Sequence, residues 1–140
     1  MRVLIDTNVV LDVLMARTPH VDHALAIFTL ADSDRVRGVL GATTITTVFC
    51  LATEGVGVAR AREHVRTLLD LFDVASLDRA VLAAALDAGF EDYEDGVLHE
   101  AAVVAGVDAI VTRDGAGFAS ASLPVFTPSA FLAALRGDLR

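Results

Sequence analysis

The sequence contains no lysine, so its positive charge comes from arginine alone. Its 140 residues include 11 basic and 19 acidic side chains, which gives a formal net charge of −8. A protein that binds nucleic acid mainly through charge carries a basic stripe that displaces counterions from phosphates. No such stripe is present, which argues against a tight, passive binder of RNA. The charge does not argue against an enzyme whose carboxylates hold divalent cations, because such cations can bridge to a phosphate.

The absence of lysine also counts against two classes of phosphate-handling α/β protein. A phospho-acceptor receiver domain uses a lysine to engage the phosphoryl group. A phosphatase of the haloacid-dehalogenase type needs a lysine and an Asp-x-Asp motif, and residues 6–8 read Asp-Thr-Asn. A P-loop or dinucleotide site needs a glycine-rich loop after the first strand, and that is missing too.

Cysteine is nearly absent, with Cys50 the single example. One thiol excludes an internal disulfide and a zinc cluster built from cysteines. The neighbouring residues 48–52 are otherwise apolar, so Cys50 is predicted to be packed in the core.

Long hydrophobic runs are missing as well, although the mean hydropathy is high at +0.58. The apolar segments 3–10 and 97–107 are interrupted by charged residues, histidine or glycine. Neither reaches the roughly 20 apolar residues that cross a bilayer. No signal peptide is expected, because the sequence has no basic segment followed by an apolar stretch. We therefore expect a soluble, cytoplasmic protein without a membrane span.

Hydrophobic periodicity predicts strands that alternate with helices along the chain. The predicted strands are residues 2–5, 36–42, 72–77, 109–112 and 123–126. The predicted helices are residues 8–15, 21–31, 48–52, 58–71, 81–88, 93–105 and 128–135, with a threonine-rich segment 43–47 before the third. Regular alternation predicts one α/β domain over residues 1–140, with a parallel sheet covered by helices on both faces.

Acidic residues stand where predicted strands end or a predicted helix begins. Asp6 follows the first strand, Asp92 and Asp95 open the helix 93–105, and Asp114 follows the fourth strand. Each has an ordinary structural explanation, as a helix cap, a first-turn acid or a turn residue. Ligands of open α/β sheets bind outside the carboxyl ends of the strands. If the first and fourth strands are neighbours, these acids converge there.

Several carboxylates in one crevice repel one another unless a cation neutralises them. Hard divalent cations such as Mg²⁺ and Mn²⁺ prefer carboxylate oxygens and retain several water molecules. Such ions activate water and stabilise charge on a phosphoryl group. The pattern therefore favours a metal site with phosphodiester chemistry.

Three motifs in this order resemble those of the PIN-domain nucleases. They are Asp-Thr-Asn at residues 6–8 after an apolar strand, Asp-Tyr-Glu-Asp at 92–95, and Ile-Val-Thr-Arg-Asp at 110–114 with Phe118 shortly after. The resemblance extends to Thr-Pro-Ser-Ala-Phe at 127–131 and is closest to VapC-like toxins with a D-[FY]-x-D motif. It implies a three-layer α/β/α fold with four to five parallel strands in the order 3-2-1-4-5. It also implies an Mg²⁺- or Mn²⁺-dependent endoribonuclease that acts on RNA, forms homodimers and is often blocked by a cognate antitoxin.

The resemblance also assigns roles to individual residues. Asp6 would be the central metal ligand, Asp95 its partner, and Asp114 a ligand or the group that orients its water. Asp92 matches an acid of the same branch and is counted with Asp6, Asp95 and Asp114 among the expected metal ligands. The carboxylates would be held by hydrogen bonds from Thr7, Asn8 and Thr112.

One position departs from the family pattern. Many PIN nucleases carry a glutamate at the start of the third helix, where this chain has Thr47, and Glu54 lies about 10 Å further along the helix. A threonine hydroxyl can hold a water molecule but brings no charge, which puts a second metal ion in doubt. Arg113 could contact a phosphate or form a salt bridge with a neighbouring acid. His99, one turn after Asp95, could approach the site or be a buried, hydrogen-bonded histidine.

Two functions remain open at this level. The first is a VapC-like ribonuclease that cleaves RNA with a metal-activated water. The second is a PIN-fold protein that has lost catalysis and binds protein or RNA. Thr47 supports the second, whereas retention of Asp6, Asp95 and Asp114 supports the first.

Overall fold

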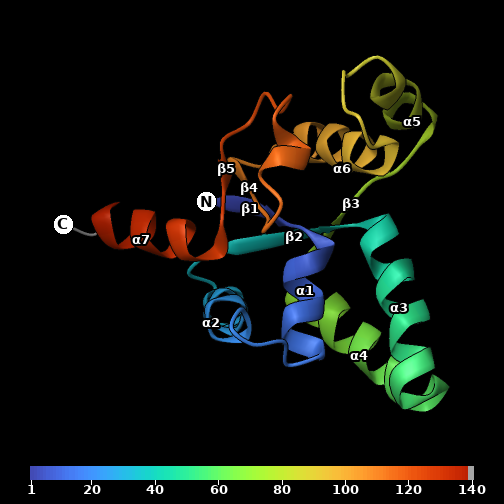
Figure 1. Cartoon of the computed structure of the whole chain (residues 1–140), viewed down its shortest axis with the longest axis vertical. Coiled ribbons are helices and arrows are strands. Elements are labelled where there is room, and N and C mark those ends of the chain that lie inside the picture. Colours follow the sequence, from blue (N-terminus) through green and yellow to red (C-terminus); the bar gives the residue numbers. More distant parts are fainter. Residues whose placement is uncertain (139–140) are drawn as a thin grey trace.

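The first strand lies at the centre of a five-stranded parallel sheet (Figure 1). The structure is a computed structural model that describes residues 1–138 of the 140 in the expected domain. The order β3-β2-β1-β4-β5 confirms the order that the resemblance implies. The strands are β1 (Arg2–Ile5), β2 (Arg37–Gly41), β3 (Asp73–Ala75), β4 (Ala109–Val111) and β5 (Val125–Phe126).

Helices cover both faces of the sheet, as the alternation of strands and helices predicts. They are α1 (Thr7–Leu14), α2 (Val21–Asp32), α3 (Ala42–Val56), α4 (Val58–Leu71), α5 (Arg79–Leu86), α6 (Tyr93–Val104) and α7 (Pro128–Asp138), with a 3₁₀ turn η1 (Ala116–Phe118). In Figure 1, α5 and α6 lie on one side of the sheet and α1 to α4 on the other.

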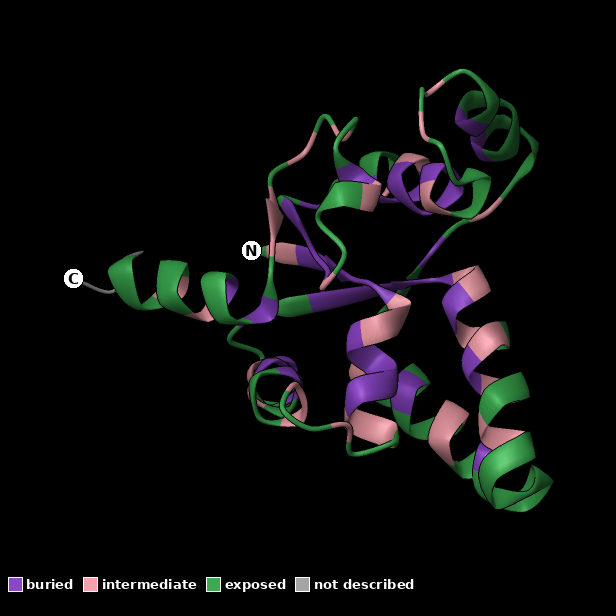
Figure 2. Ribbon diagram, in the orientation of Figure 1, coloured by how far each residue is buried: buried purple, intermediate pink, exposed green. Residues whose placement is uncertain are grey.

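Alternate residues of β1 contribute to two separate hydrophobic cores, because successive side chains of a strand point to opposite faces. Val3 and Ile5 pack with α1, α2, α4 and α7, whereas Leu4 packs with α5 and α6. All three side chains are fully buried, and Figure 2 shows the strands as the buried centre of the molecule. The sheet is therefore clamped between two apolar layers, and its polar chemistry is confined to the ends of the strands.

The third helix begins earlier than the sequence predicts. Residues 43–47 were expected to precede the helix, yet they form its first turns, with Gly41 in extended conformation as the N-cap. Threonine is β-branched and disfavours helix, but two of these hydroxyls have partners in the fold. Thr46 Oγ1 donates to the Thr43 carbonyl at 3.0 Å, and Thr44 Oγ1 shares a hydrogen bond of 2.7 Å with Thr7. The third strand is also shorter than predicted, at three residues.

The prediction that Cys50 is buried is wrong, because the thiol is exposed. The helix turns the buried residues Thr44 and Val48, four positions apart, toward the core. Cys50 lies two residues beyond Val48 and therefore falls on the opposite side of α3.

Two further features bear on where a site can lie. No helix within residues 1–138 is long and apolar enough to span a membrane. The ends of β1 and β4 are adjacent, with Ile5 opposite Val111, and the Asp6 amide continues the pairing by donating to the Val111 carbonyl at 2.9 Å. The residues that follow these two strands must therefore lie side by side.

Candidate active site

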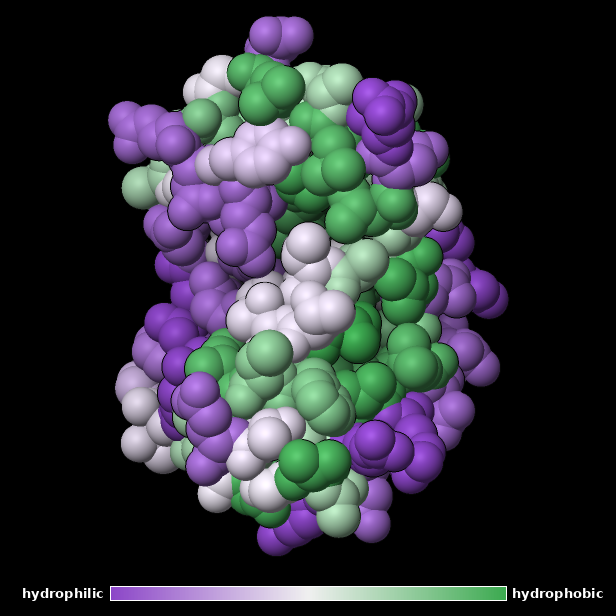
Figure 3. All heavy atoms as spheres, turned by 90° about the vertical axis from the view of Figure 1, so that its right-hand side faces the viewer, coloured by the Kyte–Doolittle hydropathy of each residue, from purple (hydrophilic) through white to green (hydrophobic). Residues whose placement is uncertain are grey.

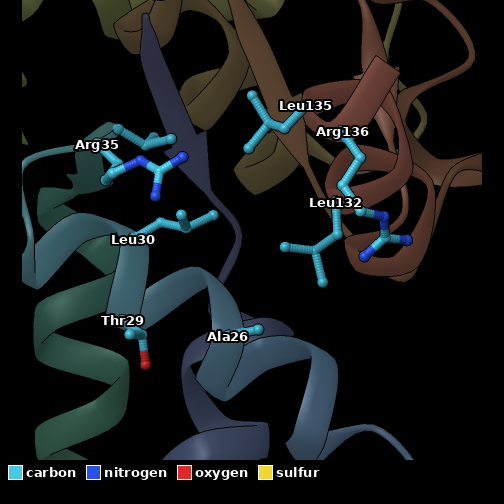
Figure 4. A pocket seen from close by; sticks show the side chains of 8 residues that line it. Ala26, Thr29, Leu30, Arg35, Leu132, Leu135 and Arg136 are labelled. Atoms are coloured by element: carbon cyan, nitrogen blue, oxygen red, sulfur yellow. The ribbon is translucent and has the colours of Figure 1, made fainter. Parts of the chain in front are cut away.

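Two cavities differ sharply in their chemistry. One, of about 550 Å³, is an apolar groove between α2 and α7, where Leu30 and Leu132 face each other with Arg35 and Arg136 at the margins (Figure 4). The other, of about 420 Å³, lies at the carboxyl edge of β1 and β4 and is lined mainly by polar and acidic side chains. We call the second the acidic cavity. Its residues are Asp6, Thr7, Asn8, Leu11, Arg17, Thr43, Thr47, Asp92, Glu94, Asp95, Leu98, Arg113 and Asp114.

Asp6 lies at the floor of the acidic cavity and is only 7% exposed. It is the N-cap of α1, and its Oδ1 accepts a hydrogen bond from the Thr7 amide at 2.7 Å. Its Oδ2 accepts from the Thr112 hydroxyl at 2.7 Å and from the Asn8 side-chain amide at 3.3 Å. The carboxylate is therefore fixed by donors from both neighbouring strand ends.

Thr112 connects the two strand ends. Its buried hydroxyl donates to Asp6 and accepts from the Asp114 amide at 3.0 Å. Asn8 completes the network, since its Nδ2 lies 3.3 Å from Thr112 Oγ1 and its Oδ1 accepts from the Arg113 amide at 3.2 Å. These contacts tie Thr112, Asn8 and Asp6 into one network.

The helix α6 brings two more acids to the cavity. Asp92 is the N-cap of α6 and accepts from the amides of Glu94 and Asp95, at 2.8 and 3.3 Å. Its carboxylate thus has a structural role as well as lining the cavity. Asp95, in the first turn of α6, is half-buried and faces the same cavity.

Asp114 approaches Asp95 across Gly117. Asp114 Oδ1 accepts from the Gly117 amide at 3.1 Å. A methyl group added at Gly117 would lie 2.6 Å from Asp114 Oδ2 and 3.0 Å from Asp95 Oδ2. Both carboxylates therefore converge on a point that only glycine leaves open.

Burial and the crowding of negative charges raise the pKa values of two acids in the cavity. Burial raises the pKa of Asp95 to about 6, helped by the negative charges of Asp6, Asp92, Asp114 and Glu94. Burial also raises the pKa of Asp6, although the hydrogen bonds from Thr112 and Thr7 oppose the rise. A bound cation would relieve this repulsion, and carboxylate oxygens are the ligands that hard divalent cations prefer.

Two arginines form one wall of the acidic cavity, and a buried acid holds both. Asp12, on α1, has no exposed surface. Its Oδ2 accepts from Arg113 Nε at 2.6 Å, and its Oδ1 accepts from Arg113 Nη2 at 3.1 Å and from Arg17 Nε at 2.8 Å. Of the two alternatives left open for Arg113, the structure shows the salt bridge, and the same side chain also lines the cavity.

Threonines of α3 form the opposite wall. Thr47 lines the cavity in the second turn of the helix, and Thr43 lies one turn before it. Thr7 and Thr44 share a hydrogen bond of 2.7 Å between their hydroxyls, which ties the start of α3 to the start of α1. Glu54 is exposed and does not line the cavity.

His99 does not line the acidic cavity. It is 4% exposed, and its Nε2 accepts from the Ser122 amide at 3.0 Å while its ring packs on Phe90. Burial lowers the pKa of His99, and the neighbouring Glu100 opposes the shift. Of the two alternatives, the structure shows the buried, hydrogen-bonded histidine.

Sequence reasoning missed Asp12, Arg17, Thr43 and Gly117. Asp12 did carry a signal, because it is an acid within the apolar run 9–14 of an otherwise buried helix face. Thr43 could have been found from its spacing of four residues to Thr47, once this segment is taken as helical. Arg17 follows Asp12 by five residues and pairs with it, so the spacing of this acid and base was a local signal. Gly117 matters through its approach to Asp95 on another element, which no local pattern shows.

A model of the PIN domain family matches residues 2–116 of the chain. The chain belongs to the PIN domain family. A search among curated proteins gives no match.

Solved structures share the PIN fold of this chain at low sequence identity. A chain of a toxin–antitoxin complex from Klebsiella pneumoniae is 19% identical, with a TM-score of 0.68 over 90% of this chain and 97% of that one. A chain of VapBC-1 from nontypeable Haemophilus influenzae is 13% identical, with a TM-score of 0.69 over 92% and 99%. A chain of VapBC2 from Rickettsia felis, bound to a DNA fragment from its promoter, is 10% identical, with a TM-score of 0.67 over 89% and 97%. Identities this low establish the fold alone.

Proposed function

We propose that this PIN domain is an endoribonuclease that depends on Mg²⁺ or Mn²⁺ and serves as the toxin of a type II toxin–antitoxin pair. The observation that carries the proposal is the convergence of Asp6, Asp95 and Asp114 on one cavity at the carboxyl edge of the sheet. The raised pKa of Asp95 supports it, because perturbed carboxylates in a cleft are typical of functional sites. The similarity to chains of solved toxin–antitoxin complexes supports the biological context.

The donor set fits a hard divalent cation in its chemistry. Asp6, Asp95 and Asp114 would hold the ion, with Asp92 at the cavity margin. Within residues 1–138, no three acidic, histidine or cysteine side chains lie close enough to coordinate a metal without moving. Asp6 is fixed by three hydrogen bonds, whereas Asp114 is exposed. Binding would therefore draw Asp95 and Asp114 toward Asp6.

Different residues of the acidic cavity would have different roles in hydrolysis. A bound Mg²⁺ or Mn²⁺ would supply a more acidic water and offset the charge on the phosphodiester. Asp6 is oriented by Thr7, Asn8 and Thr112, which restricts where its oxygens can act. Arg113 presents its guanidinium to an anionic substrate, and the hydroxyl of Thr47 can hold a water on the opposite wall.

The partners follow from the same proposal. RNA is the substrate, and a cognate antitoxin would cover the acidic cavity. We also propose a homodimer, because exposed hydrophobic side chains gather on the face that carries α3 and α5 (Figure 3). They include Leu51 and Val56 of α3 and Leu82 and Leu86 of α5. Apolar surface of this kind is typical of interfaces between protein chains.

The alternative is a PIN-fold module without catalysis that binds protein or RNA. Thr47 is the observation that favours it, because this uncharged side chain lines the cavity where the family pattern has a glutamate. A module without chemistry has no need of a divalent site, so metal binding separates the two functions.

The first test is a calorimetric Mn²⁺ titration of the wild type beside Asp95→Asn, followed by RNA cleavage assays on repurified proteins. We expect saturable binding and cleavage in the wild type, and loss of both in the variant. Cleavage that persists unchanged in Asp95→Asn would overturn the proposed site. Absence of binding in both proteins would favour the module without catalysis.

A further inference from the structure

A third cavity, of about 230 Å³, borders the acidic cavity and shares Arg113 with it. Its other polar side chains are His20 and His23, before and within the first turn of α2, and Thr127 and Ser129, around the start of α7. We call it the histidine cavity. We propose that it binds the phosphate next to the scissile one in a single strand of RNA, an inference that rests on the proposed function.

The contrast in charge between the two cavities is the first argument. Five acids line the acidic cavity, and none lines the histidine cavity. In a chain with a net charge of −8, an indentation lined by an arginine, two imidazoles and two hydroxyls is a favourable place for an anion. Every one of these side chains can donate a hydrogen bond to a phosphate oxygen.

The position of Arg113 is the second argument. Asp12 holds Arg113 Nε and Nη2, so the guanidinium is fixed on the boundary between the two cavities. No residue within the described chain occupies Arg113 Nη1, and the side chain remains 29% exposed. A guanidinium held in this way loses little entropy when it binds a phosphate.

The start of α7 adds to the same surface. The helix spans 11 residues, and the Thr127 hydroxyl caps it by accepting from the Ala130 amide at 3.2 Å. Its N-terminal end carries partial positive charge from the peptide dipoles, which favours an anion beside Ser129. Here the dipole reinforces side chains that already point to an anion.

The two cavities share Arg113 in their walls, and this neighbourhood points to a ligand that spans both. A lone anion would fill one cavity, whereas a polymer with phosphates at regular intervals can occupy both at once. The scissile phosphate would lie against the carboxylates with their metal, and the adjacent phosphate would lie against His20, His23 and Ser129. Contacts to successive phosphates amount to recognition of the RNA backbone, which positions the strand but carries no sequence information.

The test compares two substrates with the double variant His20→Gln and His23→Gln. Single-stranded RNA offers neighbouring phosphates, whereas bis(p-nitrophenyl) phosphate has one phosphodiester and no neighbour. We expect kcat/KM for RNA to fall about tenfold or more, mainly through KM, since hydrogen bonds to charged groups are strong. Hydrolysis of bis(p-nitrophenyl) phosphate should not change. His64→Gln is the matched control, because His64 lines a different indentation between α1 and α3.

An equal loss on both substrates would overturn the proposal, since it would mean that the site itself had been disturbed. An unchanged kcat/KM for RNA would overturn it as well. A binding measurement keeps the inference separate from catalysis: fluorescence anisotropy of labelled RNA with Asp95→Asn protein in metal-free buffer. In that background the two histidine substitutions should weaken binding of RNA but not of an RNA analogue with neutral methylphosphonate linkages. Should the wild type cleave nothing while this difference persists, the proposed function fails and the phosphate site stands. If the difference is absent, the phosphate site is wrong.

Discussion

At the scale of single residues, Asp12 is a fully buried acid whose charge depends on its ion pairs. Its carboxylate is fully buried and receives hydrogen bonds from Arg17 and Arg113. Removing one partner of a buried ion pair leaves the other charges uncompensated, which costs about 3–5 kcal/mol. We therefore expect Asp12→Asn to lower the free energy of unfolding by roughly this amount in urea denaturation.

Asp73 provides the matched control for Asp12. It also pairs with two arginines, Arg2 and Arg37, but all three side chains are at the surface. Exposed pairs contribute less than about 1 kcal/mol, so Asp73→Asn should change stability little. Equal costs for the two substitutions would show that burial does not decide the energetics of these clusters.

Asp95 gives a prediction about pH. Its folded-state pKa is raised to about 6, above the value of about 3.9 expected in the unfolded chain. The folded protein therefore binds a proton more readily, and the free energy of unfolding falls as pH rises through this window. In metal-free buffer at pH 7, Asp95→Asn should be more stable than the wild type. The advantage should shrink toward pH 4, as measured by urea unfolding at a series of pH values; a difference that stays constant across pH would contradict this origin.

Gly117 tests whether the carboxylates must converge. Alanine there would place a methyl group against Asp114 and Asp95, at 2.6 and 3.0 Å from their oxygens. We expect Gly117→Ala to weaken Mn²⁺ binding about tenfold or more by calorimetry, as changes around metal ligands do. Gly115→Ala is the control, because a methyl group at Gly115 meets nothing within 4 Å. Equal affinities in the two variants would mean that the glycine is not needed for metal binding.

At the scale of elements, a glycine in α3 and a glycine in β2 differ in what an added methyl group would meet. Gly55 lies within this helix, and a methyl group there would meet nothing within 4 Å. Alanine favours helix over glycine by up to about 1 kcal/mol, so Gly55→Ala should raise the unfolding midpoint. Gly38→Ala in β2 should lower it, because the added methyl group would collide with the ring of Phe72. Thermal unfolding of both variants checks the prediction, and a shift of the same sign in both would contradict it.

The same elements explain which features could be predicted from the sequence. The order of the sheet followed from the resemblance to PIN-domain nucleases. The positions of Asp6, Asp95 and Asp114 depend on strand ends and a helix start, which have local signals. The predicted start of α3 was wrong because threonine disfavours helix by itself, whereas in the fold Thr44 is buried and its hydroxyl is bonded to Thr7. The predicted burial of Cys50 was wrong because residues that are neighbours in sequence do not lie on one side of a helix. The pairing of Asp12 with Arg113 required a contact between residues about 100 positions apart.

At the scale of the whole molecule, we propose that the two cores and their shared sheet act as one domain. The exposed leucines of α3 and α5 then predict self-association. The double variant Leu51→Arg and Leu86→Arg should shift the protein from dimer to monomer in sedimentation equilibrium. Val104→Arg, at an exposed position of α6, should leave the dimer intact. A wild type that is monomeric at all concentrations would contradict the proposed homodimer.

The central position of β1 also governs when the molecule can become active during its synthesis. Asp6 receives its hydrogen bond from Thr112, which follows 106 residues later, and its other acidic neighbours come from α6 and the loop after β4. At about 5–20 residues per second, a ribosome needs on the order of ten seconds to cover that interval. A nascent or prematurely terminated chain that ends before β4 lacks Thr112 and Asp114, so Asp6 is without its buried hydroxyl donor and one of its acidic neighbours. The proposed nuclease site is therefore incomplete until β4 and the loop after it have been synthesised.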